Sequence, residues 1–77
     1  MNKARREAIT KLTGRIDEIR SEVEALRDEE QEYFDNMPET FQDGEKGQMA
    51  EEAVNSLEEA ANALEEAIDH LNSAEGR

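Results

Sequence analysis

Residues 51–71 read EEAVNSL-EEAANAL-EEAIDHL, three consecutive seven-residue repeats in one frame. Each repeat starts with two glutamates, ends with a leucine and carries another apolar residue in its middle. When the middle residues are assigned to heptad position a, the leucines fall at position d. Apolar residues at a and d are typical of a helix that packs lengthwise against other helices. The packing residues predicted for this helix are Val54, Leu57, Ala61, Leu64, Ile68 and Leu71.

The first half of the chain has a related pattern, because its apolar residues are separated by alternating steps of three and four. This spacing predicts one long helix over about residues 3–36. Pro38 ends it, since proline lacks the amide hydrogen that a helix needs. We expect a turn over about 37–47, a second helix over about 48–72 and a frayed tail over 73–77. The packing residues predicted for the first helix are Ile9, Leu12, Ile16, Ile19, Val23 and Leu26.

Two long helices joined by about ten residues are expected to fold back on each other. The predicted fold is therefore all-α, a single domain over residues 1–77 that forms an antiparallel two-helix coiled-coil hairpin. Basic residues at position e of the first helix would then face glutamates at position e of the second. In an antiparallel pair of helices, the residue numbers of facing residues add up to a constant, which we call the index sum. Arg27 opposite Glu51 gives an index sum of 78. Arg20 opposite Glu58 gives the same sum, so both ion pairs fit one register.

The hairpin is expected to need a partner, because eleven Ile, Leu and Val residues form a thin core for a monomer. Ala53, Ala60 and Ala67 at position g widen the apolar face of the second helix beyond what one neighbouring helix covers. We expect two hairpins to pair into a dimeric four-helix bundle, or one hairpin to dock on another protein. The alternative is that alanine serves here only as a good helix former on a half-exposed surface.

Catalytic and metal chemistry find little support in the sequence. The chain has no cysteine, which excludes disulfides, thiolate nucleophiles and cysteine-based zinc sites. His70 follows Glu66 by one turn and could complete a carboxylate–histidine metal pair, although a solvated histidine is the simpler interpretation. A di-iron motif would need a glutamate three residues before the histidine, where Ala67 stands. The serines lack an evident base and no glycine-rich phosphate loop is present. We expect no enzyme activity and no cofactor.

The end of the first helix combines an acidic residue at a packing position with a group of large apolar residues. Glu30 occupies position a, where burial of an unpaired carboxylate would be costly. We therefore expect it to lie at a solvent-exposed end of the contact between the two helices, which we call the seam, or to be paired. The large residues either plug the end of the bundle or form an exposed patch that anchors a partner. They are Tyr33, Phe34, Met37 and Phe41.

Charge is distributed unevenly along the chain, whose formal net charge is −12. Residues 1–15 hold five basic side chains and one acidic one, so the remainder carries −16. Most of the surface would repel phosphates, and direct nucleic-acid binding is not expected. No apolar run is long enough for a signal-peptide core or a membrane span, and we expect a cytoplasmic protein without membrane contact.

The segment 28–42, DEEQEYFDNMPETFQ, and the acidic alanine-rich repeats that follow resemble small proteins predicted from phage and prophage genomes. Those proteins share a glutamate-rich helix, a Pro-Glu-x-x-Gln turn and a second helix of acidic alanine-rich repeats. The resemblance covers most of the chain. It implies a small accessory phage protein that binds a host protein, in the host cytoplasm, and it carries over no catalytic residues.

Two functions remain open from the sequence. The first is a non-enzymatic protein-interaction module that binds a second copy of itself, a host protein, or both. The second is an inhibitor whose acidic face mimics a phosphate backbone and occupies a host DNA- or RNA-binding protein. The rows of glutamate could equally serve only to keep the protein soluble. The residues of the candidate mimic face are Glu52, Glu59 and Glu66.

Overall fold

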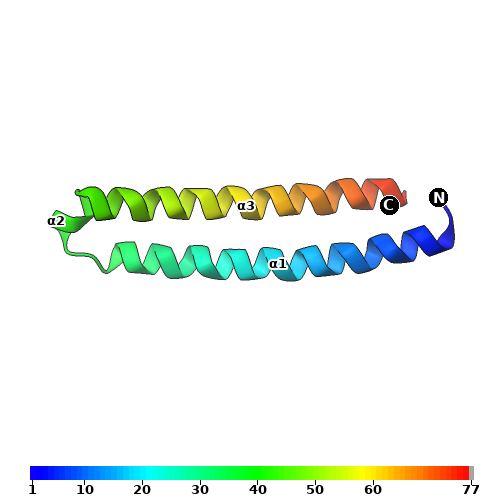
Figure 1. The fold of residues 1–77 in the computed structure, drawn as a ribbon, viewed down its shortest axis with the longest axis horizontal. Helices are drawn as coiled ribbons and strands as arrows, with labels where there is room; N and C mark the ends of the chain where they lie inside the picture. The colour runs from blue at the N-terminus through cyan, green and yellow to red at the C-terminus, as the bar shows by residue number, and fades with distance from the viewer. Residues whose placement is uncertain (77) are drawn as a thin grey trace.

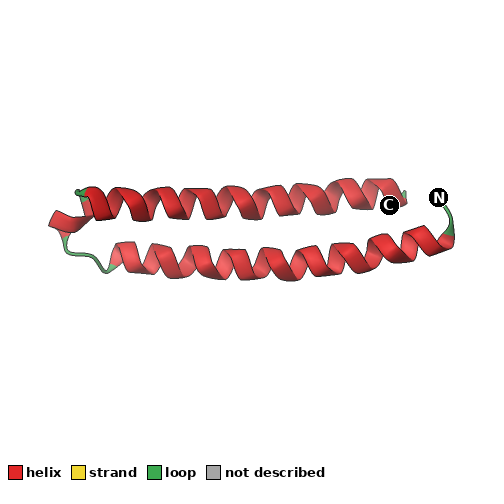
Figure 2. Cartoon of the chain, viewed as in Figure 1, coloured by secondary structure: helices red, strands yellow, loops and turns green. Residues whose placement is uncertain are grey.

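The computed structural model describes residues 1–76 and consists of two long helices and one short helix between them. Helix α1 spans Lys3–Asp35, α2 spans Glu39–Gln42 and α3 spans Glu45–Glu75. The long helices lie side by side, and the first turn of α1 is at the same end of the rod as the last turn of α3 (Figure 1). The molecule measures 58 × 15 × 14 Å. Helix fills almost the whole described chain and no strand occurs in it (Figure 2), which confirms the all-α prediction.

The ends of α1 and α3 are capped by residues that favour these positions. The Asn2 side chain accepts a hydrogen bond from the Arg5 amide, at 2.8 Å, and so satisfies one of the free amides of the first turn. Gly76 ends α3 in the left-handed conformation, with φ of 88°, which glycine adopts without steric cost. The tail predicted to fray from residue 73 is therefore helical to Glu75, and Arg77 lies outside the described residues.

The predicted turn over 37–47 is more structured than expected. Pro38 separates α1 from α2, as its missing amide hydrogen requires. The Gln42 side chain donates to the Phe34 carbonyl at 3.0 Å, so α2 caps one of the last carbonyls of α1. Helix α3 begins at Glu45 rather than near residue 48, and its first turn packs against α2.

Gly47 allows this packing because it has no side chain. It is buried, and a Cβ atom at this position would lie 2.0 Å from the Gln42 backbone oxygen. No real Cβ atom approaches a backbone oxygen so closely, so α2 and α3 can be this near only at a glycine. Gly47 is therefore what lets the turn close.

The register of the two long helices differs from the prediction by one heptad. The Thr10 hydroxyl donates to a carboxylate oxygen of Glu75 at 2.5 Å, which gives an index sum of 85 instead of 78. In this register Ala50, which is only 2% exposed, lies opposite the last residue of α1. Residues 45–49 therefore project beyond α1, and α2 packs on this overhang. This overhang accounts for the change of register, because each residue of α3 lies one heptad further along α1 than predicted.

The inward-facing rows were predicted for α3 but only partly for α1. Positions a and d of α3 are half-buried or buried, and Ala61 is 5% exposed. On α1, position a is half-buried as predicted, but the second inward row is position e instead of position d. The corrected inner row contains Thr13, Arg20, Arg27 and Phe34. The predicted packing residues Leu12, Ile19 and Leu26 are exposed instead.

Candidate interaction face

A row of large apolar residues runs along the outside of α1 beside the helix–helix seam. Leu12, Ile19, Leu26 and Tyr33 are spaced by seven residues and are 42%, 48%, 53% and 53% exposed. Because seven residues make nearly two helical turns, all four lie on one side of the helix. We call this row the apolar stripe. Scattered exposed leucines are ordinary in proteins, but four large apolar residues in line form a continuous patch.

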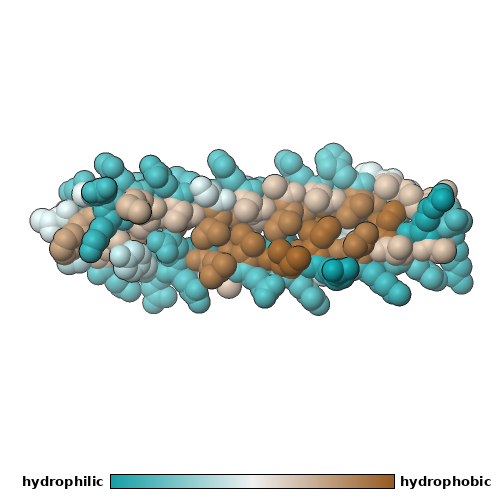
Figure 3. All heavy atoms as spheres, viewed as in Figure 1, coloured by the Kyte–Doolittle hydropathy of each residue, from teal (hydrophilic) through white to brown (hydrophobic). Residues whose placement is uncertain are grey.

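The predicted partner face of α3 lies next to the apolar stripe. Tyr33 and Ala53 line one open groove of about 410 Å³ together with Glu30 and Met49, which shows that position g of α3 borders position d of α1. Ala53 and Ala67 are half-buried, and Ala60 is exposed. Figure 3 shows the result as a band of apolar residues along the line between the helices, with hydrophilic side chains projecting from both edges.

Apart from Lys46 near the turn, the α3 edge of this band lacks charge. The next row outward on α3, at position c, contains only uncharged residues when histidine is counted as neutral. All of them are exposed. Glutamates fill positions e and f instead, and position f is the row that follows position c around the helix. Another helix could approach closely at Ser56 and Ala63, because the distance between packed helices depends on the size of the side chains at the contact. The row at position c consists of Met49, Ser56, Ala63 and His70.

The opposite long side of the rod is charged, and its ion pairs differ from those predicted. Arg20 pairs with Asp17 at 2.8 Å and also with Glu24, both on α1. Arg27 pairs with Asp28 at 3.0 Å and with Glu24 at 3.9 Å. The predicted cross-helix pairs of Arg20 with Glu58 and Arg27 with Glu51 are not formed.

The pKa shifts of these arginines report the register of the helices. The pKa of Arg20 is raised, chiefly by its hydrogen bond to Asp17, and the charge of Glu65 on α3 also raises it. A hydrogen bond to Asp28 likewise raises the pKa of Arg27, with Glu58 contributing from α3. Both cross-helix pairings have an index sum of 85, the same as Thr10 with Glu75. Position e does face position e, as predicted, but one heptad further along.

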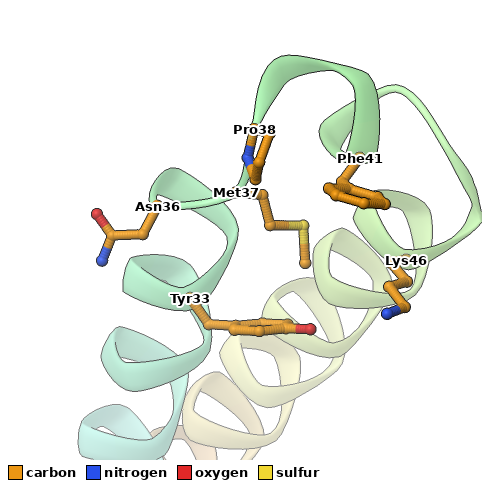
Figure 4. A pocket seen from close by; sticks show the side chains of 6 residues that line it. All are labelled: Tyr33, Asn36, Met37, Pro38, Phe41 and Lys46. Atoms are coloured by element: carbon orange, nitrogen blue, oxygen red, sulfur yellow. The ribbon is translucent and has the colours of Figure 1, made fainter.

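The aromatic group at the turn forms a shallow pocket of about 250 Å³. Figure 4 shows Met37 between Tyr33 and Phe41, with Lys46 beside the Phe41 ring. The Lys46 ammonium lies 5.7 Å from the centre of that ring, a cation–π distance. Met37 and Phe34 are half-buried, whereas Phe41 is 52% exposed. Part of the group is therefore half-buried between the helices and part faces outward, and its predicted role in anchoring a partner stays a prediction.

The side chains considered from the sequence as metal ligands are not gathered into a site among the described residues. His70 is exposed, and the described residues contain no group of three or more metal-ligating side chains close enough to hold an ion. Glu30 is half-buried at the groove that Tyr33 and Lys46 also line. None of the described helices combines the length and the apolar character that crossing a bilayer requires.

Comparison with known proteins adds nothing to this geometry, because no family model, no curated protein and no solved structure matches the chain. The resemblance to phage proteins stays a prediction.

Proposed function

We propose that this chain is a non-enzymatic protein-interaction module, an antiparallel coiled-coil hairpin that pairs with a second copy of itself to form a four-helix bundle. The apolar stripe and the neighbouring alanine row form the contact surface. The observation that carries the proposal is the half exposure of four large apolar residues at heptad spacing. Such a pattern is used in helical bundles to pack one helix against the next.

The surface area of the chain supports pairing. A folded monomer of 8.7 kDa is expected to expose about 4,700 Å². This chain exposes 5767 Å², an excess of roughly 1,000 Å². A stable protein–protein interface removes about 800 Å² from each partner. One second copy seated on the apolar band would therefore bring the exposed area of each chain close to that of an ordinary folded protein.

The burial pattern also favours pairing over a purely helix-forming role for alanine. Among the hydrophobic side chains of the described residues, only Ala50 and Ala61 are buried, and they are 2% and 5% exposed. A hairpin that leaves its large side chains half exposed gains little from the hydrophobic effect. Covering Leu12, Ile19 and Leu26 would supply that missing stabilisation.

The proposal is tested by the solution mass, measured by light scattering after gel filtration across a concentration series. We expect twice the 8.7 kDa chain mass, falling toward the monomer only on strong dilution. Leu26→Asp places a charge in the apolar stripe and is expected to weaken pairing by at least about 100-fold. A monomer at all concentrations for the unmodified chain would overturn the proposal.

Ala25→Asp is the matched control. Ala25 is the preceding residue, is exposed and lies on the outer side of α1, so the same charge enters the same helix away from the stripe. This variant should pair like the unmodified chain. Circular dichroism of both variants separates loss of pairing from loss of the helix.

The acidic mimic is a second candidate, favoured by one observation. Glu52, Glu59 and Glu66 are exposed in a straight row, and none of them forms an ion pair with a described residue. A test is competition with a fluorescent DNA duplex for a basic DNA-binding domain. Mimicry predicts displacement of the duplex at low salt that is lost when these glutamates become glutamine. The same triple substitution should leave the dimer mass unchanged, so the two functions are separable.

A further inference from the structure

We infer that the second copy lies head to tail, so that the turn of each hairpin is beside the termini of the other. This inference rests on the proposed pairing and adds the direction of the partner. The occupant of the apolar band is thus a reversed copy of the same chain, with α1 facing α1 and α3 facing α3 across a two-fold axis perpendicular to the rod.

The first argument is the charge of the two halves of the rod. In the observed register residue 20 lies opposite residue 65, so residues 20–65 form the half that contains the turn. This half holds three basic and fifteen acidic side chains, which is the entire net charge of −12. The half that contains the termini is neutral overall. Two copies with their turns together would place both acidic halves side by side, whereas reversed copies place each acidic half against a neutral one.

The second argument is the symmetry of the two rows in the apolar band. The apolar stripe is evenly spaced, so it maps onto itself when reversed about its midpoint between Ile19 and Leu26. The alanine row at position g continues to Ala74 and has its midpoint between Ala60 and Ala67. The register places that midpoint within about one residue of the midpoint of the stripe, a shift of about 1.5 Å. One two-fold axis therefore serves both rows without leaving either uncovered.

The third argument is a charge pair at the edge of the stripe. Position g of α1, on the outer flank of the stripe, holds Arg15, Glu22 and Glu29, and reversal about the midpoint of the stripe brings each Arg15 beside a Glu29 and one Glu22 beside the other. Arg15 and Glu29 are fourteen residues apart, about 21 Å along the helix, and so cannot pair within one chain. When α1 faces a reversed copy, Arg15 of each chain comes beside Glu29 of the other. Turns placed together would bring no such pair into reach.

The test uses spin labels and distances measured by pulsed electron resonance. The chain lacks cysteine, so single cysteines can be introduced at Thr40 in α2 and at Ser73 near the end of α3, both exposed. In a head-to-tail dimer two labels at position 40 lie nearly the 58 Å length of the rod apart. With turns together they would be about 10 to 20 Å apart, because packed helices are separated by about 8–10 Å.

A mixed sample supplies the reverse expectation. Chains labelled at position 40 are combined with chains labelled at position 73, and the head-to-tail arrangement predicts a short distance between the two labels. Long distances at both single positions and a short mixed distance support the inference. Short single-position distances overturn it while leaving the proposed pairing intact. A solution mass of one chain overturns both.

A charge exchange gives an independent readout. Arg15→Glu should weaken pairing by about five-fold, since it places like charges together. Adding Glu29→Arg to the same chain should restore most of the affinity, because the reversed pair forms across the interface. If the double variant is weaker than the single variant, the head-to-tail arrangement is wrong.

Discussion

The two long sides of this rod are built from the same two helices but satisfy their side chains in different ways. On the charged side, Arg20 and Arg27 find carboxylates on their own helix and lie near those of α3. On the apolar side, Leu12, Ile19 and Leu26 remain about half exposed beside a row of alanines. The difference teaches that one side satisfies its charges within a single chain, whereas the other leaves large apolar side chains uncovered, and this is the surface that the proposed second copy would cover.

Both sides exist only while α1 and α3 pack together, so a charge placed between the two helices should abolish both. Leu64→Asp would bury a carboxylate between α1 and α3 and is expected to cost about 3 kcal/mol or more in the free energy of unfolding. For a chain with so little buried apolar surface this should abolish the helical signal in circular dichroism. Asn62→Asp, two residues earlier and exposed, is the control and should stay folded.

The alignment of the two sides depends on the turn, and Gly47→Ala tests it. The added Cβ would meet the Gln42 backbone oxygen at 2.0 Å, so α2 must move away from α3. We expect a loss of about 2 to 3 kcal/mol in urea unfolding. Gly14→Ala is matched, because nothing lies within 4 Å of a Cβ there, and it should stabilise α1 by about 0.5 to 1 kcal/mol. Equal effects of the two substitutions would contradict the close approach.

Salt should sharpen the comparison, because it screens charges and leaves apolar contacts little changed. The proposed dimer would join two chains of net charge −12, so screening of their repulsion should tighten pairing several-fold as the salt concentration rises. Sedimentation at increasing salt measures this directly. A dimer that dissociates in high salt would show that ion pairs, and not the apolar stripe, hold the two copies together.

The smallest effect is expected on the charged side. Arg27→Gln removes the ion pair with Asp28, whose side chain is 71% exposed, and ion pairs that reach solvent contribute little to stability. The raised pKa of Arg27 lies far above the range in which proteins are studied, so the arginine stays charged and no pH dependence follows. We expect a melting temperature changed by a few degrees at most and an unchanged dimer mass. A large loss of pairing would mean that the partner contacts this side.

The sequence was sufficient to predict two long helices and the inward rows of α3, because glutamates occupy the alternative faces of that helix. It was not sufficient for α1, where apolar residues fill both a and d. Hydropathy favoured d, yet the structure turns position e inward, since the aliphatic stems of Arg20 and Arg27 can cover apolar surface while their charged ends reach Asp17 and Asp28.

The register could not be predicted from charge, because the pattern of both helices repeats every seven residues. Arg27 finds a glutamate at Glu51 in one register and at Glu58 in the next, so the ion pairs do not distinguish them. The choice is made at the turn, where α2 packs on the projecting start of α3. The signal available in the sequence was Gly47 itself, a glycine inside an otherwise strong helix, which often marks a close approach of two backbones.

The constant index sum of 85 makes the rod modular in length. Removing residues 16–22 together with 63–69 would take one heptad from each long helix, and the remaining residues would keep their rows. The rod would become about 10 Å shorter, with its turn, its caps and the lateral order of its faces preserved. The same operation in reverse would lengthen it. The fold is thus a beam whose span is set by how many heptads are inserted, independently of how its ends are closed.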